Sequence, residues 1–415
     1  FLSSTAVEEG SISSTNSGKL CEIASFELFR GGIWSMAFAP TEPVVAIGTS
    51  LGNVLLFDYE SWSRTEMLGV ARLNVSKTRG ITTVSAVAKN GDQPIYAAGS
   101  SDGLVALWKR QSNYSTSGGK GGLTVESVGE QKSPRLNMGF RLVSTFNAAC
   151  RGSVYSASSP GGLSASESGY GFLMGWNLYN DCLLSGGSEG ALIRLWDIGA
   201  ERCIWLGAAF SGTATVTALC VSSDVSMNSM YHLNDSRIGN ESPFSDYQDA
   251  HRSYGVNVHA MGASDGSVAI LDDRAAHSSQ SVMCIRSHRA PVVALGLQSE
   301  ESKPLLCSAD IGGSVQLWDL RMFGRGAFRS LIGDSRGKLT SMVMRTGTSD
   351  AQIVTGSAYG SINLLSMDGQ VQQNILFHEG FLSTRIGPVT SLAQHPTRNL
   401  LATGFGDSVV TFYGF

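Results

Sequence analysis

The residue types of a nucleophilic triad occur close together in one stretch of this chain, at His288, Ser308 and Asp310. In a hydrolase built on such a triad, the histidine accepts the proton of the serine hydroxyl and the carboxylate orients the imidazole. Neither the H-E-x-x-H motif of metalloproteases nor the Walker A loop of nucleotide-binding enzymes occurs in the chain. We therefore expect a non-enzymatic protein and keep a hydrolase as an alternative.

Cysteine and histidine, the usual ligands of zinc, are scattered along the chain. The 7 cysteines are an odd number without a C-x-x-C pair, and the 7 histidines have no metal-ligand spacing. His251 and His259 lie in or beside a polar segment, and we expect both to be solvated. The sequence predicts no metal site, no cofactor and no disulfide framework, and it favours a reducing compartment such as the cytoplasm.

Charge and hydropathy exclude several classes of partner. The formal net charge is −4 and the pI is about 6.0, so no overall field attracts nucleic acid. No apolar run approaches the roughly 18 residues needed to span a bilayer, so we expect no membrane insertion. Nothing indicates a small-molecule substrate. No signal-peptide pattern is present, but the chain begins at Phe1, and we expect it to be a piece of a longer protein.

A repeat with a fixed interval organises the chain. Leu271, Trp318, Leu365 and Phe412 each end a similar glycine-containing pattern, and they follow one another every 47 residues (318 − 271, and likewise for the next two pairs). The same pattern ends further upstream at Phe57, Trp108 and Trp196. Each of these seven units reads as two strands joined by a tight turn, with a further apolar strand before it and, in all but the last unit, another after it.

Four strands in each of seven units predict an all-β, seven-bladed propeller. The last unit ends after its third strand, so we expect residues 21–29, which alternate between apolar and polar, to complete that blade and close the ring. The predicted propeller covers residues 21–415, and residues 1–20 are expected to form a flexible tail. Polar, Gly- and Ser-rich insertions are expected at residues 111–138, 150–170 and 222–255.

Two third strands end in Leu-Trp-Asp after a glycine turn, at Trp196-Asp197 and Trp318-Asp319, and this ending resembles the WD40 repeat. The resemblance implies a buried structural tetrad in the fifth blade, made of His288, Ser308, Asp310 and Trp318. In such a tetrad, hydrogen bonds would connect the turn to the neighbouring loop, and its members are satisfied only together. The tetrad accounts for the histidine, serine and aspartate of the possible triad without catalysis.

A closer resemblance rests on three stretches. They are 171–197 with its Gly-Phe-Leu-Met-Gly-Trp-Asn start, 272–293 with Ser287-His288-Arg289-Ala290-Pro291, and 368–396 with His378-Glu379-Gly380-Phe381 and Arg385-Ile386-Gly387. These resemble the C-terminal WD40 domain of the Raptor family, scaffold subunits of TOR complex 1, over residues 30–415. The resemblance implies a scaffold whose partners are subunits of the TOR kinase complex. It also implies a cytoplasmic protein recruited to the lysosomal or vacuolar surface through its partners.

One rim of the predicted ring carries the candidate partner-binding residues Arg79, Arg289, Arg336, Arg385 and Phe381. A basic ring of this kind suits an acidic or phosphorylated partner. The same rim also receives acidic residues from the turns, so the charges could neutralise one another instead. Residues 377–388, which contain Phe381, are either a structural plug over the ring or an anchor for a partner.

A second functional class rests on Trp318, Asp319 and Arg321. Their W-D-x-R pattern matches the element by which some propellers dock onto adaptors of cullin ubiquitin ligases, and it would make the chain a substrate receptor. A structural alternative is that Arg321 forms a salt bridge or stacks near the end of its strand, because long basic side chains commonly cover apolar surface there.

Overall fold

The structure is a computed structural model that describes residues 19–28, 31–69, 80–88, 93–110, 139–148, 171–177, 182–187, 190–221, 258–272, 282–300, 303–332, 338–345, 352–376 and 387–415. The tail and the three insertions expected from the sequence lie outside these residues, apart from the end of the tail at Lys19 and Leu20. Arg79, Arg336, Phe381 and Arg385 also lie outside them.

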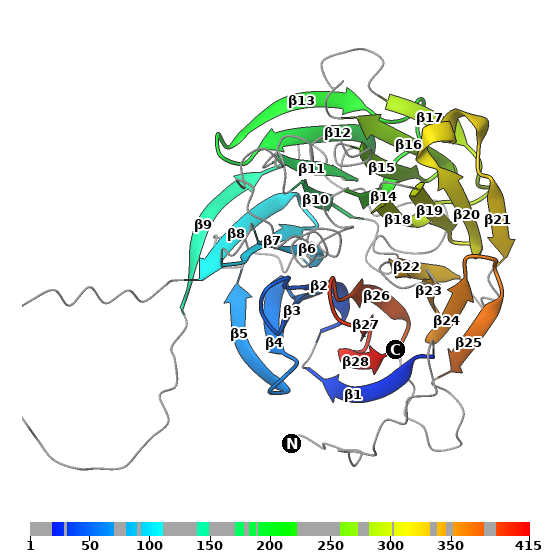
Figure 1. Ribbon diagram of the computed structural model, residues 1–415. Helices are drawn as coiled ribbons and strands as arrows, with labels where there is room; N and C mark the ends of the chain where they lie inside the picture. The colour runs from blue at the N-terminus through cyan, green and yellow to red at the C-terminus, as the bar shows by residue number, and fades with distance from the viewer. Residues whose placement is uncertain are drawn as a thin grey trace, which may run out of the picture.

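Seven four-stranded antiparallel sheets are arranged around one axis as the blades of a β-propeller (Figure 1). Blade 1 consists of β2 (Ile33–Phe38), β3 (Val44–Thr49), β4 (Asn53–Asp58) and β5 (Ser63–Gly69), and blade 2 of β6 (Ile81–Val87), β7 (Ile95–Ser100), β8 (Leu104–Arg110) and β9 (Phe140–Asn147). Blade 3 consists of β10 (Leu173–Asn177), β11 (Cys182–Gly187), β12 (Gly190–Asp197) and β13 (Arg202–Ala208), and blade 4 of β14 (Val216–Cys220), β15 (Val258–Ala263), β16 (Ser267–Asp272) and β17 (Val282–Arg286). Blade 5 consists of β18 (Val292–Glu300), β19 (Lys303–Asp310), β20 (Ser314–Asp319) and β21 (Arg329–Ile332), and blade 6 of β22 (Leu339–Arg345), β23 (Gln352–Ser357), β24 (Ser361–Ser366) and β25 (Val371–Leu376). Blade 7 consists of β26 (Val389–Gln394), β27 (Leu400–Phe405), β28 (Val409–Gly414) and the first strand of the chain, β1 (Cys21–Glu27). The seven-bladed architecture predicted from the repeat is confirmed.

The first strand of the chain closes the ring, as predicted. β1 pairs antiparallel with β28, so that Phe26 lies opposite Val410. Phe26 stacks on Trp62 of blade 1 with ring centroids 5.4 Å apart, and it also contacts Phe57. The strand ends at Glu27, two residues earlier than expected. Its apolar side chains join the last blade to the first, and closure leaves the third strand of blade 7 with no open edge.

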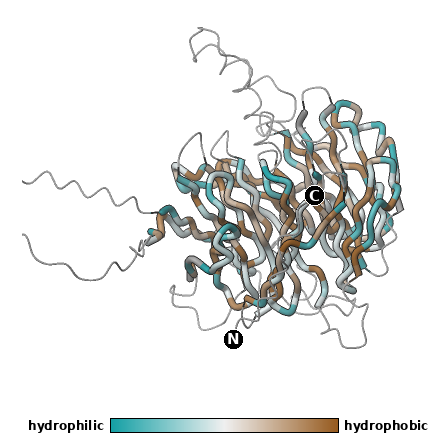
Figure 2. The backbone as a smooth tube through the Cα atoms, turned by 60° about the horizontal axis from the view of Figure 1, so that its bottom comes forward, coloured by the Kyte–Doolittle hydropathy of each residue, from teal (hydrophilic) through white to brown (hydrophobic). Residues whose placement is uncertain are grey.

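The second strand of a blade is more buried than the outermost strand. The second strands of blades 1, 6 and 7, namely β3, β23 and β27, are buried along their whole length, because both faces contact neighbouring blades. Outer strands such as β13 alternate between exposed and half-buried positions. Hydrophobic and hydrophilic positions accordingly alternate along many strands in Figure 2.

Threonine hydroxyl groups connect several blades to the next one. Thr82, Thr217 and Thr340 each lie at an irregularity in the pairing of an inner strand, where the register shifts by one residue. From there each hydroxyl donates to a backbone carbonyl at the start of the first strand of the following blade; Thr217 Oγ1, for example, lies 2.6 Å from the carbonyl oxygen of Val292. A bulge that turns a side chain out of its ladder thus provides a polar link between sheets.

Candidate functional site

The four residues of the expected tetrad are joined by hydrogen bonds in blade 5. His288 precedes β18, Ser308 and Asp310 lie on β19, and Trp318 lies on β20. His288 Nδ1 is 3.1 Å from Asp310 Oδ2 and its Nε2 is 2.7 Å from Ser308 Oγ. The indole N–H of Trp318 donates to the same Ser308 Oγ over 2.8 Å. The imidazole therefore bridges the turn and the strand, with Nδ1–H facing the carboxylate.

Burial sets the chemistry available to this group. Ser308 and Trp318 are 0% exposed, and His288 and Asp310 are nearly so. Burial opposes ionisation of Asp310, but hydrogen bonds from His288 and from the Ser314 amide lower the pKa of its carboxyl below the ordinary value. A serine hydroxyl that is enclosed and already accepts an indole N–H has no path to a substrate carbonyl, so the geometry suits a structural bridge.

Partial versions of this arrangement occur in other blades, and sequence reasoning did not identify them. In blade 3 the indole N–H of Trp196 donates to Ser185 Oγ over 3.0 Å. In blade 2 Ser100 donates to Asp102 at the turn. The recurring signal is a serine on the second strand of a blade with either a tryptophan on the third strand or an aspartate at the turn.

The pattern G-x-S-x-G also occurs at four of the repeat turns, at residues 48–52, 99–103, 186–190 and 262–266. In α/β-hydrolases this pattern leads from a strand into a helix and exposes the serine as a nucleophile. Here each occurrence leads from the second strand of a blade to the third, as between β7 and β8. The glycines serve the turn: Gly52, Gly103, Gly190 and Gly266 all have positive φ angles.

The rim that carries these turns, which we call the turn face, holds Arg289, the one candidate partner-binding residue that lies within the described residues. Arg289 is exposed there, and Lys338 is exposed beside the turn of blade 6. The acidic residues do not pair with them. Asp407 Oδ2 accepts from the Gly387 amide over 2.8 Å, and Asp265 Oδ1 accepts from the Ser267 amide over 3.0 Å. Within the described residues Arg289 and Lys338 have no ion pair, so their positive charge is directed at solvent.

The adaptor-docking candidates lie on the opposite face of the ring. Trp318 is fully buried and contacts Phe323, with ring centroids 5.1 Å apart. Asp319 caps the 3-10 helix η3 (Leu320–Arg325), and its carboxylate binds the Arg321 guanidinium through two hydrogen bonds of 3.1 Å and 2.8 Å. Arg321 is thus held in an exposed salt bridge, as the structural alternative expected.

A cavity of about 410 Å³ lies along the axis, lined by the inner strands of all seven blades. Among the described residues that line it are four methionines and no carboxylate, lysine or arginine. His395 and Cys220 are the titratable groups among these described lining residues.

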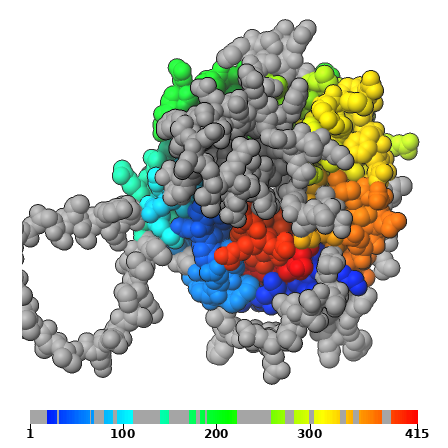
Figure 3. All heavy atoms as spheres, in the orientation of Figure 1, coloured from blue at the N-terminus to red at the C-terminus, as the bar shows by residue number. Residues whose placement is uncertain are grey.

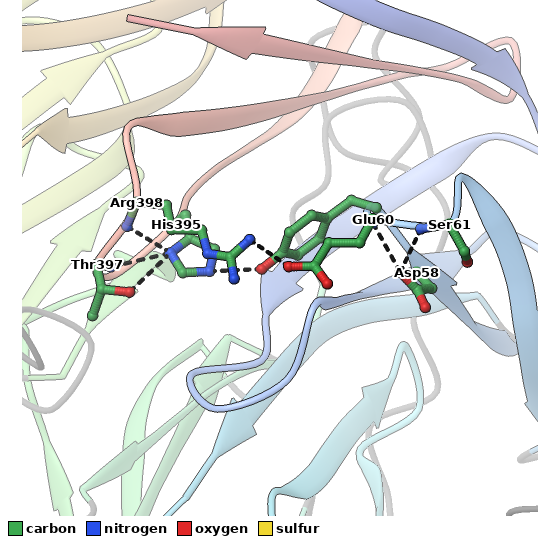
Figure 4. A network of polar contacts seen from close by, with 7 residues as sticks. Asp58, Glu60, Ser61, His395, Thr397 and Arg398 are labelled. Atoms are coloured by element: carbon green, nitrogen blue, oxygen red, sulfur yellow. Dashed lines mark hydrogen bonds and ion pairs between the residues drawn. The ribbon is translucent and has the colours of Figure 1, made fainter.

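His395 takes part in a polar network between the last and first blades (Figure 4). Its Nδ1 accepts from the amides of Thr397 and Arg398, and its Nε2 lies 3.0 Å from the hydroxyl of Tyr59. Arg398 Nη1 forms an ion pair with Glu60 over 2.7 Å. Burial and the neighbouring guanidinium of Arg398 lower the pKa of His395 to about 4.

The expectation that His259 is solvated is wrong. It lies on β15 opposite Leu271 and is fully buried, although a polar segment precedes it in the sequence. The alternation of β15 turns its side chain toward a neighbouring blade. In the described part of the chain, no group of histidine, cysteine or acidic residues could hold a metal ion, and no helix has the length and apolar character needed to cross a membrane.

Comparison with known proteins addresses the expected family. The chain is 21% identical over 380 residues, or 91% of its length, to the protein raptor homolog of Dictyostelium discoideum. It is 32% identical over 157 residues to the regulatory-associated protein of TOR 1 of Arabidopsis thaliana. It also matches the crystal structure of Chaetomium thermophilum Raptor over 93% of the chain, with a TM-score of 0.64 at 18% identity. The chain is similar to Raptor proteins over most of its length.

The Raptor similarity covers the propeller and only part of each relative. The chain spans 20% of the Dictyostelium protein, 11% of the Arabidopsis protein and 28% of the Chaetomium chain. No protein-family model matches the chain. Because the Chaetomium structure shares so little sequence identity, it establishes the propeller fold and not the role of any single residue.

Proposed function

We propose that this chain is the propeller of a Raptor-type scaffold, which binds protein partners within TOR complex 1 without catalysing a reaction. The observation that carries the proposal is the similarity to a raptor homolog over 91% of the chain. The buried tetrad of blade 5, whose serine hydroxyl is enclosed, supports a non-enzymatic role. A closed ring presents a preformed surface, so a partner binds it at little cost in conformational entropy.

The turn face is the proposed partner-binding surface. Arg289 is exposed there without an ion pair among the described residues, while Asp265 and Asp407 on the same face accept hydrogen bonds from backbone amides. We include Arg79, Arg336, Arg385 and Phe381, which the repeat assigns to the same face. A cationic rim of this kind would recognise an acidic or phosphorylated segment of a TOR complex subunit. In this role the protein would work in the cytoplasm and reach lysosomal or vacuolar membranes through its partners.

Affinity purification of the tagged chain from its own cells tests this function. We expect TOR kinase to co-purify, and the triple variant Arg79→Glu, Arg289→Glu, Arg385→Glu to recover at least tenfold less of it. Unchanged recovery would remove the turn face from the proposal. If a cullin adaptor co-purifies instead and is lost on Arg321→Ala, the ubiquitin-ligase alternative is correct.

A further inference from the structure

The cavity on the axis extends from the middle of the inner strands to the face opposite the turn face. Its described wall includes Pro40, Ala88 and Pro396, which follow the ends of β2, β6 and β26. The first residues of these strands, such as Ile33 and Val389, are buried and do not belong to the described wall. Blades 1 and 7, which both contribute to the wall, lie side by side in blue and red in Figures 1 and 3.

The pairing register sorts the wall into two levels, each with one residue from every blade. The first level pairs with the residue five positions before the positive-φ turn residue (52 − 47 in blade 1), and it contains Met, Leu or Val in every blade, from Met36 to Leu392. The next residue of each strand is small; these residues are Ala37, Ser85, Gly175, Cys220, Gly296, Val343 and Ala393. Small side chains leave room at this second level, and apolar side chains border it.

The chemistry of the wall suits an uncharged ligand. The described wall contains no carboxylate, lysine or arginine, so no opposite charge would compensate the lost hydration of an ionic group. His395 also lines the cavity, but its ring nitrogens are already engaged by the Tyr59 hydroxyl and by the amides of Thr397 and Arg398. A molecule bound here would therefore be neutral and mostly apolar.

One uncharged polar group of the wall is unused by the protein. Gln394 ends β26 and lines the cavity, and its buried Oε1 has no hydrogen-bond partner among the described residues. Buried polar groups are nearly always hydrogen-bonded, so an unpaired carboxamide in a cavity wall indicates a ligand group. The carboxamide turns about its last side-chain bond, so it can offer its oxygen or its N–H groups to a hydroxyl group.

We propose that the axial cavity binds an uncharged, largely apolar small molecule whose hydroxyl group pairs with the carboxamide of Gln394. The volume of about 410 Å³ lies within the range of roughly 300–1,000 Å³ that is usual for small-molecule sites. The ligand is bound and not converted, and the site does not depend on the proposed function of the turn face. Because it would contact inner strands of several blades at once, the ligand would stabilise the closed ring.

Three naphthalene derivatives of similar size test the site: 2-naphthalenemethanol, 2-ethylnaphthalene and 2-naphthoate. The second replaces the hydroxyl group of the first by a methyl group, and the third carries a carboxylate. In fluorescence titrations of the purified chain, we expect the alcohol to bind at a single site. The ethyl compound should bind about fivefold more weakly, because it leaves Gln394 unpaired, and the carboxylate should not bind. The alcohol should also raise the unfolding temperature of the chain.

Variants of the wall connect this binding to Gln394. Gln394→Leu should remove the preference for the alcohol and leave the binding of the ethyl compound unchanged. Gln298→Leu is the matched control and should keep the preference, because Gln298 on β18 also has a buried, unpaired Oε1 but does not belong to the described wall. Ala37→Phe fills the level of small residues and should abolish binding, with circular dichroism verifying its fold. Failure of the alcohol to bind, equal binding of the carboxylate, or a preference that survives Gln394→Leu would overturn the proposal.

Discussion

The hydroxyl of Tyr59 lies 3.0 Å from Nε2 of His395, and this hydrogen bond joins the first blade to the last. Because Nδ1 of His395 accepts two backbone amides, the neutral ring carries its proton on Nε2 and donates it to Tyr59. If Nδ1 were protonated, it could no longer accept these two hydrogen bonds, and its N–H would face two other N–H donors. The two amide contacts of Nδ1 therefore require a neutral histidine.

We predict that acid weakens the propeller through His395. Its pKa is about 4 in the folded chain, against about 6.5 in an unfolded chain. Below pH 6.5 the unfolded state binds more protons, so this contribution to stability is complete above pH 6.5 and is lost as the pH falls toward 4. Urea unfolding should show a loss of about 2 kcal/mol between pH 7 and pH 4.5 from this group.

His395→Asn is the matched variant for this prediction. The asparagine Oδ1 can accept the amides of Thr397 and Arg398 in place of Nδ1, but the side chain does not titrate. The variant should therefore unfold with a smaller dependence on pH over the same range. Parallel pH profiles for the two proteins would show that His395 is not the responsible group.

Closure by β1 predicts a large effect at Phe26. Its ring contacts Phe57 and Trp62 of blade 1, so Phe26→Ala should lower the free energy of unfolding by about 2–3 kcal/mol. Ile23, in the same strand, is nearly half exposed at an irregularity in the pairing, and Ile23→Ala should cost less than about 0.5 kcal/mol. Equal losses in urea unfolding would mean that the β1 contact with blade 1 contributes little.

The tetrad predicts a loss of stability and no loss of catalysis at Ser308. Ser308→Ala leaves the indole N–H of Trp318 and one nitrogen of His288 buried without their partner, at a cost of about 2–3 kcal/mol. Ser185→Ala in blade 3 removes only the partner of Trp196 and should cost about 1 kcal/mol. Hydrolysis of a model ester by the unchanged chain that disappears in Ser308→Ala would instead support the hydrolase alternative.

The threonine links predict that Thr217→Val weakens the contact between blades 4 and 5. Valine keeps the shape but cannot donate to the Val292 carbonyl, so we expect a loss of about 1–2 kcal/mol in urea unfolding. Thr390 provides the comparison, because its hydroxyl donates to Gly404 of its own blade. If Thr390→Val lowers the free energy of unfolding as much as Thr217→Val does, the hydrogen bond between blades stabilises the protein no more than one within a blade.

Much of the fold follows from local pattern. The turn glycines, the alternation of apolar residues and the recurring aromatic position predicted seven blades, and the missing last strand predicted the role of residues 21–29. The repeat works because each blade satisfies its backbone by pairing with strands close in sequence. His259 marks the limit: the polar composition beside it indicated solvent, whereas the strand that contains it turns the side chain inward.

The sequence by itself determined the ring, its closure and its similarity to Raptor, because these depend on features that repeat within each unit or stand in one continuous stretch. Only the tertiary structure placed the hydroxyl of Tyr59 beside His395 and brought the carboxylate of Asp407 to the backbone amide of Gly387. Those arrangements depend on side chains from different blades or from distant turns. Their packing is set by shape and charge at the contact, which no interval in the sequence records.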